Sequence, residues 1–140
     1  MAEYIVDTAI VIQELIQEPH TQYVRRLFSG LVASDKLHVP EFCLVECTNV
    51  LWKRARFEGL SQSDAETLVA DLSSLPLTLD PIDEVLTRAL QIGLAHQLAI
   101  YDSIYIALAE KYAYPLITAD AKQAAAAQTV GVTLKPITDF

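Results

Sequence analysis

The sequence is poor in cysteine, glycine and basic residues, and each shortage excludes a class of protein. Its two cysteines, Cys43 and Cys47, belong to no CxxC motif and have no neighbouring histidine cluster, so we expect buried free thiols rather than a zinc site. With four glycines in all, the chain contains neither a GxxxxGK[ST] phosphate loop nor a GxGxxG dinucleotide motif. A serine hydrolase is equally unsupported, because no GxSxG motif occurs.

The chain also has no long hydrophobic run. Its apolar stretches are interrupted by Gln, Asp, Glu or Thr, so no transmembrane span is expected. The start of the chain has neither the positive charge nor the long apolar stretch of a signal peptide, and a cytoplasmic protein is the default expectation. A chain of 140 residues with 52% hydrophobic residues is expected to fold as one domain over residues 1–140.

Positive charge is scarce. Ten Lys and Arg residues face 18 Asp and Glu residues, so the formal net charge is −8. Nucleic-acid binding usually requires a basic footprint, so this balance counts against such a substrate. If acidic side chains hold metal ions, part of the negative charge is neutralised, and the charge balance then says little against a nucleic-acid substrate. An acidic surface equally suits a basic partner.

Short apolar runs alternate with amphipathic stretches along the whole sequence. This order predicts an α/β domain with a mainly parallel sheet. Strands are expected at 3–7, 37–39, 75–79, 115–118 and, as a final edge strand, 132–134. Helices are expected at 8–17, 20–33, 41–57, 61–73, 80–94, 101–112 and 120–128, with Asp80 capping the fifth and Pro81 at its first position.

Four acidic residues stand in or beside apolar stretches that should be core: Asp7, Glu46, Asp102 and Asp120. An ionised carboxylate is costly to bury without a partner, so four such residues suggest a shared cation. Oxygen ligands favour Mg²⁺ or Mn²⁺. Asp7 and Asp120 follow predicted strands, and ligands of open α/β sheets bind beyond the carboxyl ends of the strands.

Each acid taken singly also has a structural explanation. Asp102 could interact with a helix dipole, Asp120 could be a helix N-cap, and Glu46 could be a solvated helix residue. Other acidic sites fit less well. A haloacid dehalogenase requires a second Asp two residues after the first, where this chain has Ala9. A response-regulator receiver needs an acidic pair that is missing.

Together, the segments IVDTAIVI, PEFCLVECTNVLWK, AIYDSIYIALAE and LITADAK resemble the PIN domain, especially the small VapC-type toxins. The resemblance covers essentially the whole chain and implies a parallel sheet of four or five strands flanked by helices on both faces. It implies that Asp7, Glu46, Asp102 and Asp120 converge and hold one or two Mg²⁺ or Mn²⁺ ions. The activity it implies is metal-dependent endoribonuclease cleavage by metal-activated water.

The resemblance also implies a cognate antitoxin protein and a homodimer. Thr8, Asn49 and Thr118 are expected to orient carboxylates or water, and Lys122, Lys53 and Arg54 to contact RNA phosphates. Either the apolar face at Val24, Leu27, Phe28 and Leu31 or the helix from Phe42 to Trp52 could be the dimer seam.

Two other functions remain open from the sequence. One is a catalytically weak, metal-stabilised PIN-like binding module. The other is a metal-dependent phosphoesterase that acts on DNA or on a small phosphorylated molecule.

Overall fold

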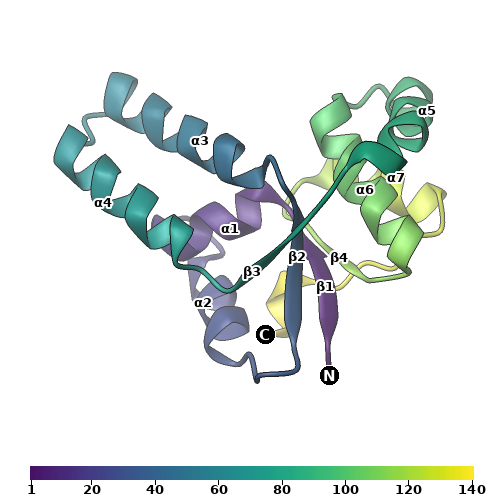
Figure 1. The fold of residues 1–140 in the computed structure, drawn as a ribbon, viewed down its shortest axis with the longest axis horizontal. Coiled ribbons are helices and arrows are strands. Elements are labelled where there is room, and N and C mark those ends of the chain that lie inside the picture. Colours follow the sequence, from purple (N-terminus) through teal and green to yellow (C-terminus); the bar gives the residue numbers. More distant parts are fainter.

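The computed structural model describes residues 1–140 and contains one four-stranded sheet in the order β3-β2-β1-β4 (Figure 1). Its strands are β1 (Glu3–Val6), β2 (Lys36–Pro40), β3 (Leu77–Asp80) and β4 (Leu116–Ile117). Every pair of neighbouring strands is parallel. The prediction of an α/β domain with a parallel sheet is therefore confirmed.

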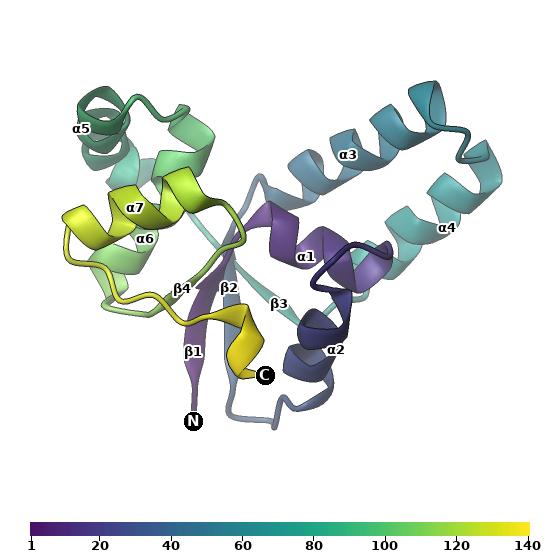
Figure 2. The ribbon, with the colours of Figure 1, turned by 180° about the vertical axis from the view of Figure 1, so that it is seen from behind.

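Seven α-helices cover the sheet on both faces. Helices α1 to α4 lie on one side and α5 to α7 on the other, and α3 and α4 extend as a hairpin away from the strands (Figures 1 and 2). No single helix combines the length and hydrophobicity needed to span a membrane. The helices are α1 (Thr8–Leu15), α2 (Thr21–Ser29), α3 (Cys43–Phe57), α4 (Gln62–Ser73), α5 (Leu86–His96), α6 (Ile100–Tyr112) and α7 (Ala121–Thr129).

Strands β1 and β4 carry consecutive buried residues and are therefore covered on both faces, which explains their continuous apolar sequences. Ile5 and Leu116 point into the core beneath α5, α6 and α7. Their neighbours Val6 and Ile117 point into the core beneath α1 to α4. This alternation follows from the two-residue period of a strand, and it divides the interior into two hydrophobic clusters.

Three details of the predicted elements are wrong. Asp80 does not cap a helix: it ends β3, and its carboxylate lies 3.1 Å from Nδ1 of His38. A short 3-10 helix follows (Asp83–Val85), and α5 begins only at Leu86. The expected edge strand at 132–134 does not form. Only Leu134 pairs with the sheet there, in one isolated bridge to Leu116.

The apolar face of α2 belongs to the core. Val24 and Leu27 are buried, and Phe28 and Leu31 pack against the same cluster. This face packs into the core of a single molecule, so it is not free to serve as a dimer seam.

Candidate active site

The carboxyl edge of the sheet opens onto a cavity of about 290 Å³ whose lining includes four acidic side chains. Asp7 comes from the end of β1, Glu46 from α3, Asp102 from the first turn of α6, and Asp120 from the residue before α7. The structure therefore brings together residues that are far apart in sequence. The remaining lining residues are Thr8, Ala9, Ile12, Val50, Tyr105 and Gln123.

Asp7 is the most deeply buried of the four acids, with 4% of its surface exposed. As the N-cap of α1, its Oδ1 accepts a hydrogen bond from the Ile10 amide at 2.9 Å. The Thr118 hydroxyl donates to Oδ2 at 2.5 Å. Burial, together with the charges of Asp120 and Asp102, raises the pKa of Asp7 to about 6 despite these two hydrogen bonds.

Glu46 is positioned by two hydroxyl groups. Thr8 Oγ1 donates to Glu46 Oε1 at 2.8 Å, and the Tyr105 hydroxyl donates to the same oxygen at 3.0 Å. The Tyr105 side chain is buried, and burial raises the pKa of its hydroxyl above the ordinary value, so it stays a proton donor. These bonds hold one carboxylate oxygen of Glu46.

Asp102 and Asp120 are joined through Gln123, a buried residue of α7. The Gln123 backbone amide donates to Asp120 Oδ1 at 2.9 Å, which makes Asp120 the N-cap of α7. The Gln123 side-chain amide donates to the Asp102 carbonyl oxygen at 3.0 Å, and Gln123 Oε1 lies 3.0 Å from the Thr118 hydroxyl oxygen, which also contacts Asp7. Through its backbone amide and its side chain, Gln123 thus connects the segments that carry three of the acids.

The four carboxylates have no cationic side chain paired with them. No salt bridge of the protein involves any of them. Burial and the charge of Asp120 raise the pKa of Asp102, whereas Lys122 lowers it. As the side chains stand, no group of three or more Asp, Glu, His or Cys residues forms a ready-made metal cluster. The donor set nevertheless suits a hard divalent cation, because it offers only oxygen ligands and unbalanced negative charge.

The predicted supporting residues are placed unequally. Thr8 and Thr118 each donate to one of the acids. Asn49 lies outside the cavity, exposed on α3 beside Val45 and Trp52. Asn49 follows Glu46 by three residues on the same helix, but this spacing does not bring Asn49 into the cavity.

The predicted phosphate-binding residues lie outside the lining of the cavity. Lys122 is exposed, and its Nζ donates to the Gln97 carbonyl oxygen at 2.7 Å. Arg54 forms salt bridges with Glu18 and Glu58, which leaves it little freedom to bind an anion. Lys53 is exposed on α3 and forms no salt bridge.

Tyr105 and Gln123 are two site residues that were not predicted from the sequence. Tyr105 stands in an apolar helical stretch, and a buried tyrosine hydroxyl usually requires a hydrogen-bond partner. Gln123 follows Asp120 by three residues, the spacing of a helix capping box. Both signals were present in the sequence, but the partners of these side chains depend on the tertiary structure.

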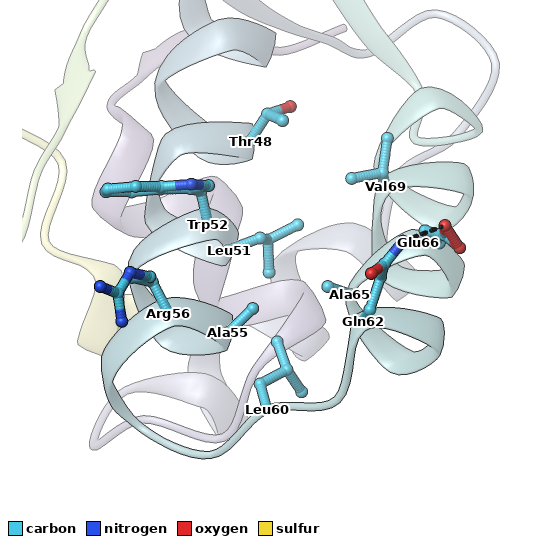
Figure 3. A pocket seen from close by; sticks show the side chains of 10 residues that line it. All are labelled: Thr48, Leu51, Trp52, Ala55, Arg56, Leu60, Gln62, Ala65, Glu66 and Val69. Carbon is cyan, nitrogen blue, oxygen red and sulfur yellow. Dashed lines mark hydrogen bonds between the residues drawn. The ribbon is translucent and has the colours of Figure 1, made fainter.

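The largest cavity, about 540 Å³, lies elsewhere, between α3 and α4 (Figure 3). Leu51 and Ala55 from α3 face Ala65 and Val69 from α4 across it, and Leu60 closes one end. Its lining is mainly apolar and includes a single carboxylate, that of Glu66. It therefore lacks the groups for metal-dependent chemistry, and the acidic cavity remains the candidate active site.

Comparison with known proteins finds similar sequences and similar folds. The PIN domain family model matches residues 4–128. Ribonuclease VapC3 of Pyrobaculum aerophilum is 30% identical over 118 residues, which cover 83% of this chain and 88% of that protein.

Two solved structures share the fold. PAE2754 from Pyrobaculum aerophilum has a TM-score of 0.73 at 20% identity, covering 99% of this chain and 85% of that chain. A toxin-antitoxin complex from Klebsiella pneumoniae has a TM-score of 0.59 at 16% identity, covering 96% and 97%.

Proposed function

The chain belongs to the PIN domain family, and from this premise we propose that it is a metal-dependent endoribonuclease and the toxin of a type II toxin-antitoxin pair. The observation that carries the proposal is the convergence of Asp7, Glu46, Asp102 and Asp120 on one cavity at the carboxyl edge of the sheet. A relative that is 30% identical is named a ribonuclease, which supports RNA as the substrate.

The four carboxylates would hold one or two Mg²⁺ or Mn²⁺ ions. When bound, the cation supplies an activated water and stabilises the negative charge that builds up on the phosphate. Thr118 and the Ile10 amide fix the carboxylate of Asp7. Thr8 and Tyr105 hold Oε1 of Glu46, which leaves its other oxygen available to the cation. These bonds orient the ligands before the cation arrives, so less ordering is needed on binding.

The RNA backbone requires positive charge near the acidic cavity. Lys122 follows Asp120 by two residues, and its charge acts on Asp102. We assign it the first phosphate contact, with Lys53 as a more distant one. Arg54 would have to leave its partners Glu18 and Glu58 to contribute.

Two protein partners complete the proposal. A cognate antitoxin would block the acidic cavity, and a basic side chain inserted among the four carboxylates would offset their charge. A second copy of the chain would form a homodimer. The solved toxin-antitoxin complex that shares this fold supports a partner protein of this kind.

The test is cleavage of a labelled single-stranded RNA by the purified protein. We expect cleavage that requires Mg²⁺ or Mn²⁺ and stops on addition of EDTA. Asp7→Asn and Asp102→Asn should each abolish cleavage with the fold retained. Asp71→Asn, at an exposed position of α4, is the matched control and should leave cleavage unchanged.

The alternatives give different results. RNA binding without cleavage in the presence of either metal would identify a binding module. Cleavage of single-stranded DNA or of a small phosphate ester, with RNA untouched, would identify another phosphoesterase. Normal RNA cleavage by both Asp7→Asn and Asp102→Asn would show that the site is wrongly assigned.

A further inference from the structure

The outer side of α3 carries an exposed cluster of aromatic and basic side chains. Trp52 and Phe57 expose 55% and 69% of their surfaces. Lys53 and Arg56, which stand between them in the sequence, are also exposed. We call these four residues the α3 patch. Trp52 and Arg56 border the large cavity between α3 and α4, but Figure 3 shows their ends directed away from α4.

The patch continues the face of α3 that carries Glu46. Lys53 follows Glu46 by seven residues, close to two full turns, so the two side chains share a face about 10 Å apart along the helix axis. Phe57 follows Lys53 by four residues on that face, about 16 Å from Glu46 along the axis. Val50, between Glu46 and Lys53, still lines the acidic cavity. A strand that leaves the cavity along α3 therefore meets Lys53 first and Phe57 next.

The two cations of the patch are free to bind an anion. No salt bridge involves Lys53 or Arg56, whereas their neighbour Arg54 is paired with Glu18 and Glu58. The chain as a whole has a net charge of −8, so two unpaired cations close together on one helix are a local exception. A polyanion that is repelled by the rest of the surface would be attracted to this part of α3.

The aromatic rings of the patch are arranged to receive a flat group. The rings of Trp52 and Phe57 meet edge to face, with centroids 5.8 Å apart and planes at 90°. In this geometry one ring presents only its edge, so both of its faces remain free of the other ring. Cζ of Arg56 lies 5.2 Å from the centroid of the Phe57 ring. Nucleic-acid bases stack on exposed rings and on guanidinium planes, whatever their sequence.

The fold does not account for the exposure of these rings. The buried face of α3 is formed by Cys43, Cys47 and Leu51, which supply its core contacts. Figure 1 shows α3 extending away from the sheet as one arm of the α3–α4 hairpin, so its outer side has no neighbouring element. Adjacent exposed apolar groups rimmed by polar residues commonly mark an interaction site.

We propose that the α3 patch binds single-stranded RNA beyond the acidic cavity. The scissile phosphate lies at the four carboxylates, Lys53 contacts a phosphate of the flanking nucleotides, and the bases that follow stack on Phe57 and Trp52. A basic groove combined with stacking rings is the usual way to bind a single strand without reading its sequence. This inference rests on the proposed ribonuclease function and names where the substrate continues outside the cavity.

The fluorescence of Trp52 tests the proposal directly, because it is the only tryptophan of the chain. The titration uses Asp7→Asn, which should not cleave, with Mg²⁺ and a single-stranded RNA of about ten nucleotides. We expect saturable quenching, because a base would stack on the indole ring. A strand of equal length made of abasic nucleotides keeps the phosphates but has no bases. It should bind at least about fivefold more weakly and leave the fluorescence unchanged.

Substitutions in the same Asp7→Asn background separate stacking from charge. Phe57→Ala should weaken RNA binding at least about fivefold, whereas Phe57→Tyr keeps a ring and should bind as tightly as its parent. Lys53→Ala should make the slope of log K against log salt shallower by about 0.7, the value for one phosphate of a single strand. Val32→Ala and Lys36→Ala are the matched controls and should change neither quantity, because both exposed residues lie before or at the start of β2, away from the carboxyl edge of the sheet.

Two results would overturn the proposal: saturating RNA that leaves the Trp52 fluorescence unchanged, or Phe57→Ala and Lys53→Ala variants that both bind RNA as tightly as their parent. Quenching by phosphatidylglycerol vesicles but not by RNA would show that the patch binds a membrane surface instead. Cleavage by the wild type tests the ribonuclease function separately. RNA cleavage with an unresponsive Trp52 would refute the patch alone, whereas quenching by RNA without any cleavage by the wild type would refute the ribonuclease alone.

Discussion

The buried carboxylate of Asp7 should destabilise the metal-free protein. Asp7 is 4% exposed, and burial raises its pKa from 3.8 to about 6. A carboxylate whose pKa is higher in the folded state stabilises the fold only when protonated. This stabilisation is complete below pH 3.8 and is lost as the pH rises through 6. From the two pKa values, the loss at pH 7.5 is about 3 kcal/mol.

The substitution Asp7→Asn should remove this cost. Asparagine has nearly the same shape, accepts the Ile10 amide as an N-cap, and carries no charge. We expect metal-free Asp7→Asn to be more stable than the wild type by about 3 kcal/mol at pH 7.5 and by about 1 kcal/mol at pH 4.5. The acid would then be retained for binding a cation, at the expense of stability.

Urea unfolding in EDTA at the two pH values measures the difference. Asp71→Asn, at an exposed site, should change the free energy of unfolding by less than about 0.5 kcal/mol. Added Mg²⁺ should stabilise the wild type much more than Asp7→Asn, because a ligand of the folded state stabilises it by mass action. If metal-free Asp7→Asn were no more stable at pH 7.5, or if the gap were independent of pH, the reasoning would be refuted.

Other side chains around the cavity give three further predictions. Tyr105→Phe removes a hydrogen bond to Glu46, so urea unfolding should show a loss of about 1 kcal/mol and calorimetry a weaker affinity for Mg²⁺; an unchanged affinity would contradict the positioning role. Gln123→Leu deprives the Asp102 carbonyl of its amide donor and should cost about 2 kcal/mol, whereas Gln128→Leu, exposed on the same helix, should cost less than about 0.5 kcal/mol. Lys122→Ala should raise KM for RNA and flatten its dependence on salt, and an equal salt dependence would exclude a phosphate contact.

Local sequence signals predicted most of the fold because they act over short distances. Ser61 caps α4, a helix expected at 61–73, with its hydroxyl accepting from the Asp64 amide at 3.1 Å. Asp120 likewise caps α7. Asp80 had an equally good capping pattern with Pro81, but its side chain instead bonds His38 on the neighbouring strand. A tertiary contact overrode a local preference there.

The candidate site also depends partly on local sequence signals and partly on tertiary contacts. The sequence alone identified the four acids, because a lone carboxylate beside an apolar run is costly to bury and therefore conspicuous. It also determined that strand ends would carry Asp7 and Asp120. Only the tertiary structure decided which polar side chains support them, since the bonds of Gln123 and Tyr105 join segments 21 and 59 residues apart in the chain. Helical spacing shows which residues share a face of a helix but not what lies opposite that face. The spacing therefore grouped Asn49 with Glu46, although Asn49 lies outside the cavity. The exposure of the leucines on α5 likewise became visible only in the folded chain.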